Sequence, residues 1–145
     1  MVVGEIIVWS ITTMPLAAPE DLTIRAFVVR ERRERFLELL AKPKQRHKIT
    51  DSLAHPHPAW FDSRFVKQIT SSQRGAVGIA KLRREKGAGP KCWVISEDKS
   101  LDAREMELEP LLNQIVGYGM GAILCCVPGR LAFVESEDGR FILEK

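Results

Sequence analysis

The fold is decided by the stretch Ala122-Ile-Leu-Cys-Cys-Val-Pro-Gly-Arg-Leu-Ala-Phe-Val-Glu-Ser-Glu-Asp-Gly-Arg-Phe-Ile-Leu143, in the last part of the sequence. Three short apolar runs in it predict strands, and turn-forming residues separate them, Pro128-Gly129 after the first and Glu137-Asp138-Gly139 after the second. Because such short links join neighbouring strands that run in opposite directions, the stretch predicts two consecutive antiparallel hairpins. The predicted strands are 122–127, 131–135 and 140–143.

A strand and a helix precede this stretch. The apolar run 92–96 predicts a strand, and turn-forming residues at 100–104 link it to the helix. Three glycines lie between this helix, at 108–115, and the predicted strand 122–127. A phosphate-binding loop, in contrast, comes directly before its helix. We therefore expect Gly117, Gly119 and Gly121 to end the helix and to turn the chain toward Ala122. The helix itself is marked by apolar residues at i, i+3, i+4 and i+7, namely Leu108, Leu111, Leu112 and Ile115.

The first half of the chain carries helical patterns. Pro19-Glu20-Asp21 opens an element, because proline and acids suit a first helical turn. Residues 22–29 remain open between helix and strand, since β-branched side chains are frequent there. An amphipathic helix is predicted over 30–41. Further helices are predicted over 43–54, ended by His55-Pro-His-Pro58, and over 74–86, ended by Gly87, with Val77, Ile79, Ala80 and Leu82 inward; 59–70 is expected to be a loop or broken helix.

Together these elements predict an α+β fold, with N-terminal helices packed on a C-terminal antiparallel sheet of three to five strands. The composition is 45% hydrophobic and 28% charged, which excludes a disordered chain, a collagen-like repeat and a bare coiled coil. We expect residues 19–145 to form a single domain. Residues 1–18 are expected to be either a first strand over 6–11 or an extension upstream of a start at Met14.

Cysteine usage and the N-terminal sequence indicate the compartment. Three cysteines, two of them adjacent and all in apolar runs, predict buried reduced thiols, and the lack of a Cys-x-x-Cys spacing speaks against structural zinc. The apolar residues 2–18 contain no Lys or Arg and include Glu5, which suits neither a signal peptide nor a membrane span. We therefore expect a cytoplasmic protein that needs no membrane, metal or cofactor.

Several segments resemble a family of small bacterial proteins. They are Cys92-Trp-Val-Ile-Ser-Glu-Asp, Leu101-Asp-Ala-Arg-Glu-Met, Gly117-Tyr-Gly-Met-Gly and Pro128-Gly-Arg-Leu-Ala-Phe. The resemblance extends back to residues 36–55, and it is one of pattern. It implies a bacterial, cytoplasmic, single-domain protein and carries no activity.

Charge is distributed unevenly. Residues 1–96 carry 17 Lys and Arg against 9 Asp and Glu, while residues 97–145 carry 5 against 10. A basic half predicts an anionic partner, most simply DNA or RNA, because lysine and arginine neutralise phosphates. A helix face whose cations pair with Glu31, Glu34 and Glu38 explains the same residues, and an acidic protein or self-association through opposite patches also stays open. The predicted contact residues are Arg30, Arg32, Arg33, Arg35, Lys42, Lys44, Arg46 and Lys48.

An alternative interpretation is a hydrolase or nuclease. Glu97, Asp98 and Asp102 follow the predicted strand 92–96, and carboxylates at a strand end are able to hold Mg²⁺. His55 adds an acid–base group that titrates near neutrality. A solvated loop and a helix-ending His-Pro sequence account for these residues equally well. Arg130, beside the Pro-Gly turn, is a separate candidate for binding a carboxylate or phosphate.

Overall fold

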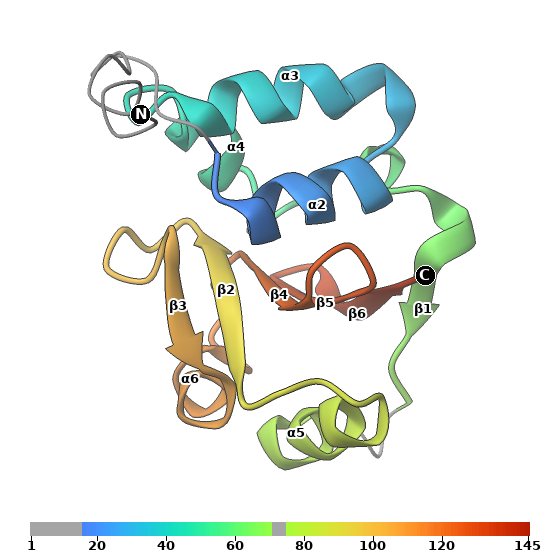
Figure 1. Ribbon diagram of the computed structural model, residues 1–145. Coiled ribbons are helices and arrows are strands. Elements are labelled where there is room, and N and C mark those ends of the chain that lie inside the picture. The colour runs from blue at the N-terminus through green and yellow to red at the C-terminus, as the bar shows by residue number, and fades with distance from the viewer. Residues whose placement is uncertain (1–15, 71–74) are drawn as a thin grey trace, which may run out of the picture.

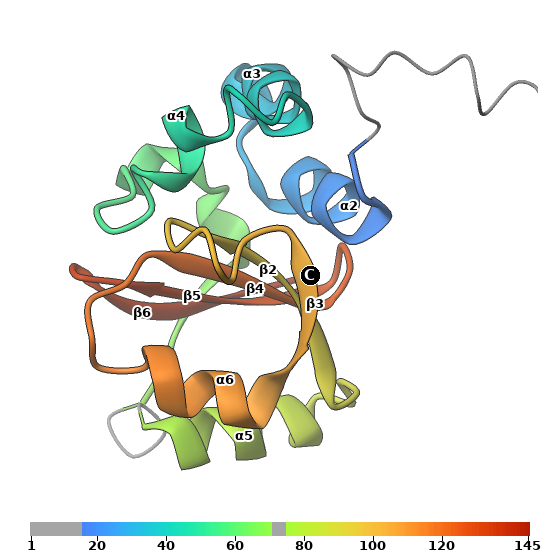
Figure 2. The ribbon, with the colours of Figure 1, turned by 90° about the vertical axis from the view of Figure 1, so that its left-hand side faces the viewer.

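The computed structural model describes residues 16–70 and 75–145, which form one antiparallel sheet between two groups of helices (Figures 1 and 2). Helices α2, α3 and α4 cover one face of the sheet, and α5 and α6 cover the other. None of the helices in these two ranges has the length and apolarity that crossing a membrane requires. The helices are α2 (Ala18–Phe27), α3 (Arg30–Ala41), α4 (His47–Thr50), α5 (Ala76–Glu85) and α6 (Leu108–Ile115), with 3-10 turns η1 (Pro58–Trp60) and η2 (Ser63–Phe65).

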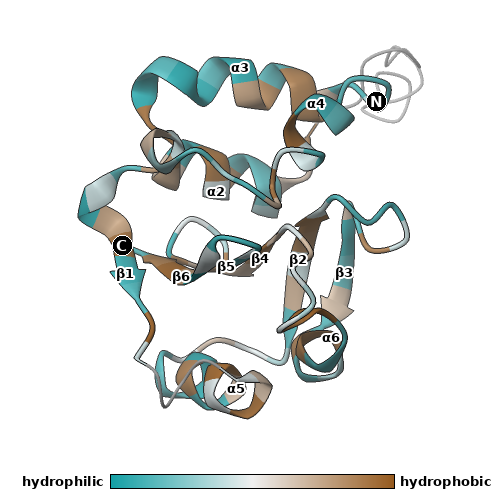
Figure 3. Ribbon diagram, turned by 180° about the vertical axis from the view of Figure 1, so that it is seen from behind, coloured by the Kyte–Doolittle hydropathy of each residue, from teal (hydrophilic) through white to brown (hydrophobic). Residues whose placement is uncertain are grey.

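The sheet has the strand order β1-β6-β5-β4-β2-β3, and all neighbours are antiparallel. The two consecutive hairpins predicted from residues 122–143 are confirmed, with Glu135 opposite Arg140 in the second. In Figure 3 the central strands are largely hydrophobic, as expected for a sheet covered on both faces. The strands are β1 (Val66–Gln68), β2 (Lys91–Ser96), β3 (Arg104–Glu107), β4 (Ala122–Val127), β5 (Leu131–Ser136) and β6 (Gly139–Glu144).

The α+β class is confirmed, but the described residues contain six strands rather than three to five. The two additional strands, β1 and β3, are the edges of the sheet. Val66-Lys67-Gln68 is too short to show alternation, and 104–107 is Arg-Glu-Met-Glu, which has a single apolar residue. Charged edge strands resist pairing with other chains, so they carry little of the hydrophobic pattern that predicts a strand. The strand predicted at 6–11 lies outside the described residues.

Packing on the face of the sheet that α2, α3 and α4 cover decides whether residues 22–29 are helix or strand. They are helical as far as Phe27, because α2 buries Ile24 and Phe27 against the sheet. The chain then extends at Val28, which forms an isolated antiparallel bridge with Phe61. Helix α3 has the predicted bounds, 30–41, and it buries the stripe Phe36, Leu37, Leu39 and Leu40.

The helix predicted over 43–54 is much shorter. Only α4 is helical, and turns flank it on both sides, such as the one closed by the 2.8 Å bond from Gln45 N to Lys42 O. Cations crowd the first turns of this stretch, and the N-terminal end of a helix dipole disfavours them. The buried side chains Ile49 and Leu53 still anchor the segment in the core.

The second face is built by α5 and α6. The apolar side chains predicted at i, i+3, i+4 and i+7 of α6 are all buried, which confirms that helix. On α5 the prediction for Val77 is wrong, since its side chain is 81% exposed. The helix packs through the row that contains Ile79 and Arg83, and Val77 lies off that row.

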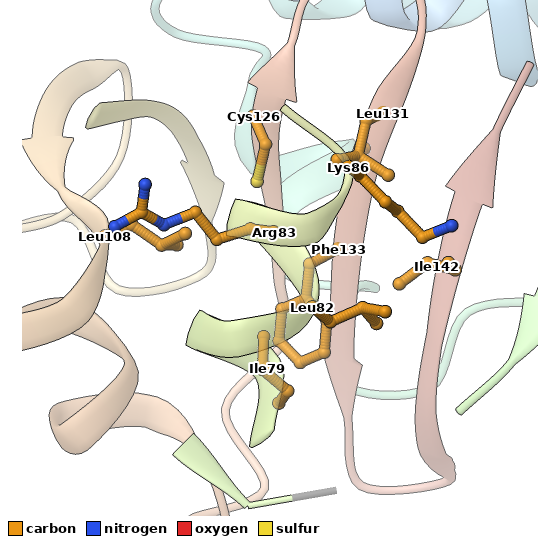
Figure 4. A pocket seen from close by; sticks show the side chains of 10 residues that line it. Ile79, Leu82, Arg83, Lys86, Leu108, Cys126, Leu131, Phe133 and Ile142 are labelled. Carbon is orange, nitrogen blue, oxygen red and sulfur yellow. The ribbon is translucent and has the colours of Figure 1, made fainter. Parts of the chain in front are cut away.

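The space between α5 and the sheet is filled by side chains. Figure 4 shows Ile79 and Leu82 of α5 beside Phe133 and Ile142 of the strands. The space that these side chains leave measures about 10 Å³, which is scarcely room for one water molecule. This interface is therefore packed core and offers no room for a ligand.

Candidate functional site

Five predicted contact residues form an exposed group on α3 and on the segment around α4. Arg30, Arg32 and Arg35 project from α3, and Lys44 and Lys48 follow it. None of the five makes an ion pair or a side-chain hydrogen bond with the described residues. We call these five residues the cationic surface.

The other three predicted contact residues are already engaged. Arg33 is half-buried and donates to the carbonyl oxygen of Val28 at 3.2 and 3.4 Å. Lys42 pairs with Glu38, one helical turn back, at 3.3 Å. Arg46 is turned inward and its side chain is only 14% exposed. Sequence spacing places all eight cations in one run, but only five of them are both exposed and unpaired among the described residues.

Arg46 links three distant parts of the chain. Its guanidinium forms two 2.9 Å hydrogen bonds with the carboxylate of Asp102 and also pairs with Glu20 on α2. Glu20 accepts a further bond, 2.7 Å long, from the indole nitrogen of Trp93 on β2. Burial raises the pKa of Glu20, and although burial acts against the charged guanidinium, its bonds to Asp102 and Glu20 raise the pKa of Arg46. We call these four residues the Arg46 cluster; its role is structural.

The carboxylates proposed for catalysis serve the loop that follows β2. Glu97 accepts a 2.6 Å bond from the backbone nitrogen of Gly121, and Asp102 accepts from Ser96 N as well as from Arg46. Asp98 accepts from the backbone and hydroxyl of Ser100, and these bonds lower its pKa. Each acid thus faces a different partner. Among residues 16–70 and 75–145, no three His, Cys, Asp or Glu side chains gather around a common metal position.

His55 is exposed and lies apart from these acids. Its Nε2 is 2.5 Å from a Glu137 oxygen, and its Nδ1 is 3.1 Å from Asp138, in the turn between β5 and β6. The hydrogen bond with Asp138 and the charges of both acids raise the pKa of His55. This contact fastens the segment after α4 to the hairpin turn, and the backbone bond from Glu137 N to Ala54 O reinforces it.

The pKa of His55 provides a first prediction. Asp138→Asn is expected to lower the midpoint of His55 toward the ordinary value of about 6.5, because it removes the charged hydrogen-bond partner that contributes most to the raised pKa. In the wild type, the stabilising contact should be fully present at low pH and lost as the pH rises through the raised pKa of His55. An NMR titration of the imidazole signals measures the midpoint. Glu105→Gln, an exposed acid on the opposite edge strand, should leave it unchanged; an equal shift in both variants would contradict the assignment.

A hollow lies beside this turn, between the His55–Phe61 loop and strands β1 and β6. Its volume is about 300 Å³, and it is lined by Phe61, Phe141, Gln68 and His57 among others. The His57 Nδ1 accepts a 3.0 Å bond from the backbone nitrogen of Ala59, which orients the ring. Sequence analysis missed Gln68 and Phe141 as site residues. Nothing in the local pattern marks them, because three separate segments build the hollow.

Arg130 lies on the turn between β4 and β5, exposed and without a side-chain partner among the described residues. It borders a smaller hollow of about 150 Å³, together with Lys86, Glu144 and Lys145. Lys86 and Glu144 neutralise one another at 2.9 Å. Arg130 is therefore available to an anion, but it does not lie on α3 or α4.

The glycines after α6 have the structural role predicted from the sequence, which is to end the helix and turn the chain. Gly117 and Gly119 follow α6 with positive φ angles of 92° and 72°, which glycine adopts readily. At Gly121 the backbone of Leu53 and Ala54 comes so close that an added Cβ would overlap it. The link holds the N-terminal segment against the sheet and is not placed to bind a phosphate.

The three cysteines are free thiols. Burial raises the pKa of Cys92 and of Cys125 to about 12, and it also raises the pKa of Cys126. A thiol with so high a pKa is a poor nucleophile. The prediction that these residues serve packing is confirmed for Cys92 and Cys125, which are buried in opposite layers of the core.

Comparison with known proteins supplies no relative from which a site could be transferred. No family model, no curated protein and no solved structure matches the chain.

Proposed function

We propose that the protein is a non-enzymatic binding protein that contacts nucleic acid through the phosphates, using the cationic surface. The observation that carries the proposal is that five exposed cations lack a carboxylate partner among the described residues. Lysine and arginine that lie free on a folded surface attract phosphates and release counterions on binding. Buried, free thiols suit a reducing compartment, and a cytoplasmic location is part of the proposal.

The neighbouring acids do not cancel this charge. Glu38 lies 3.3 Å from Lys42, and Glu34 lies 3.7 Å from Arg25, a cation that it shares with Asp21. Glu31 and Asp51 are the exposed acids of this region that lack an ion pair among the described residues. With Arg25, Arg33 and Lys42 added to the cationic surface, eight cations stand against five acids, which leaves a local charge of +3; the acids are Asp21, Glu31, Glu34, Glu38 and Asp51.

The proposal predicts a steep salt dependence. If all five cations contact phosphates, the logarithm of the binding constant should fall with the logarithm of salt concentration with a slope of about −4. Such contacts carry no sequence information, so mixed sequences should bind with similar affinity. Hydrolysis is not part of the proposal, because Glu97, Asp98 and Asp102 are each occupied by structural hydrogen bonds.

The test is binding of labelled mixed-sequence oligonucleotides, measured by fluorescence anisotropy at low and at physiological salt. The double variant Arg32→Glu, Arg35→Glu is expected to lower the affinity by about tenfold or more at low salt and to reduce the salt slope by about 2. The matched control is Lys81→Glu, Arg104→Glu, which changes the net charge equally on α5 and on the far edge strand.

The outcomes separate the proposal from its alternatives. Equal losses in the two double variants would show that net charge alone acts, and would overturn the proposed surface. Absence of binding even at low salt would do the same and would direct attention to protein partners. A molar mass measured by light scattering without nucleic acid identifies self-association, which nucleic-acid binding does not require.

A further inference from the structure

The hollow beside β1 and β6 differs in chemistry from the cationic surface. Part of its lining is aromatic and apolar: Phe61 and Phe141 meet edge to face with ring centroids 5.7 Å apart, and Pro56 and Pro58 also line it. Phe61 is buried while Phe141 is only half-buried, so the Phe141 ring is the part that a ligand reaches. A volume of about 300 Å³ is at the lower end of ligand sites, which suits a single planar ring system.

Polar groups stand at the rim of this hollow. Since His57 Nδ1 accepts from Ala59 N, the neutral ring carries its proton on Nε2, which is a donor. Gln68 is exposed on β1 and has no side-chain partner among the described residues, so its amide offers a donor and an acceptor. Asp138 adds carboxylate oxygens, which His55 shares. The rim thus presents both donors and acceptors to a ligand.

The charge around the hollow disfavours a phosphate. Asp138 is an acid, and because side chains alternate along β6, the Arg140 side chain leaves the face opposite to that of Phe141. There the Arg140 Nε lies 2.7 Å from an oxygen of Glu135, which is fully buried. The ligand that fits is neutral, planar and able both to donate and to accept hydrogen bonds, as a nucleobase is.

The loop that borders the hollow also contacts α3, which carries part of the cationic surface. Trp60, in the turn that follows Pro58, meets Phe36 of α3 edge to face at 5.2 Å. Arg32 is one helical turn before Phe36, so it projects from α3 beside this contact. Figure 2 shows α3, α4 and the loop after α4 on the same side of the sheet. A strand with one base in the hollow would thus lie on the side of the sheet that carries the cationic surface.

We propose that the hollow formed by His57, Phe61, Gln68 and Phe141 takes an unpaired nucleobase, so that the partner is a single strand. This inference rests on the proposed function and narrows it. Bases in a duplex are paired and stacked, and their Watson–Crick edges are unavailable, whereas a single strand offers both the ring face and that edge. Free nucleosides share the base chemistry, so the test must distinguish them from a strand.

The test measures the binding of single strands and of duplexes of the same sequence. It is made on the wild-type protein and on a variant in which one exposed glutamine is replaced. The wild type is expected to bind the single strand about tenfold more tightly than the duplex, since stacking one base on an aromatic ring contributes at this level. Gln68→Ala should weaken single-strand binding by roughly 2- to 10-fold, the range for one lost hydrogen bond, and leave duplex binding unchanged. The matched control is Gln114→Ala on α6, equally exposed and on the other face of the sheet.

A second measurement uses ligands without phosphates and keeps the inference testable if a variant folds poorly. Free nucleosides added to the ¹⁵N-labelled wild type should shift the side-chain amide signal of Gln68, but bind more weakly than the strand by about tenfold or more, since they lack the phosphate contacts. Nucleoside affinity equal to that of the strand would mean a mononucleoside site and would overturn the inference.

Failure of this inference differs from failure of the proposed function. Equal affinity for single strand and duplex, with no effect of Gln68→Ala, would overturn the base site. If Arg32→Glu, Arg35→Glu still abolished binding in that case, the proposed function would stand. If neither the arginine variant nor the glutamine variant changed binding, both would fall.

Discussion

Replacing Arg46 by methionine is expected to lower the free energy of unfolding by about 3–5 kcal/mol, the usual effect of removing one partner from a buried ion pair. Glu20 is 1% exposed and Asp102 is 14% exposed, so both carboxylates would lose their cation while remaining largely shielded from bulk water. Methionine fills much the same space as the aliphatic part of arginine, which limits any contribution from a cavity. Urea unfolding followed by circular dichroism measures the change.

Two further variants show whether the buried charge is the cause. Lys48 is two residues away and exposed, so Lys48→Met should change the free energy of unfolding by no more than about 0.5 kcal/mol. Adding Glu20→Gln to Arg46→Met should recover part of the loss, because the uncompensated carboxylate becomes a neutral amide that can still accept from Trp93. A double variant less stable than Arg46→Met alone would contradict the charge explanation.

The Arg46 cluster also governs how binding experiments should be designed. Arg46 belongs to the basic run of the sequence, and reversing its charge would place a third acid beside Glu20 and Asp102. The resulting loss of affinity would report unfolding instead of a lost phosphate contact. Variants of Arg32 and Arg35 avoid this, because their side chains are exposed and unpaired within the described residues.

The parts of the fold that sequence predicted well are those fixed by local pattern. Helix α3 has an apolar stripe at helical spacing, and the hairpins of β4, β5 and β6 have turn residues at each link. The ambiguous residues 22–29 show the limit of that method. Their β-branched side chains favour a strand, but burial of Ile24 and Phe27 against the sheet decides for a helix up to Phe27.

The sequence predicted which residues of the candidate site carry positive charge, but not which of them are exposed and free. Composition identifies eight cations, yet it does not tell that Arg46 meets Glu20 and Asp102, which are 26 and 56 residues away in the chain. The hollow was not predictable at all, since Gln68 on a three-residue edge strand carries no signal. Both cases need the tertiary arrangement, because pairing and concavity arise between segments that are distant in sequence.

Gly121→Ala is expected to destabilise the protein by about 3 kcal/mol or more, at the upper end of the range for overpacking. The added methyl group would overlap the backbone nitrogen of Ala54 and the carbonyl carbon of Leu53, and backbone atoms cannot move aside as a side chain does. Gly121 is also held from two sides: its nitrogen donates to Glu97, and its carbonyl accepts from the Ser96 hydroxyl at 3.2 Å. It has little freedom to retreat from the collision.

Gly89→Ala provides the matched control, because an added Cβ there meets nothing within 4 Å and the backbone is not left-handed. Its effect should stay within about 0.5 kcal/mol, since it changes only a surface loop. Gly121→Ala should also disturb the segment that carries His55 and His57, so amide exchange in residues 53–57 should speed up more than in α6. Equal stability of the two alanine variants would show that the 53–54 backbone yields at little cost, and that this contact does not fix the position of the His55–Phe61 loop over the sheet.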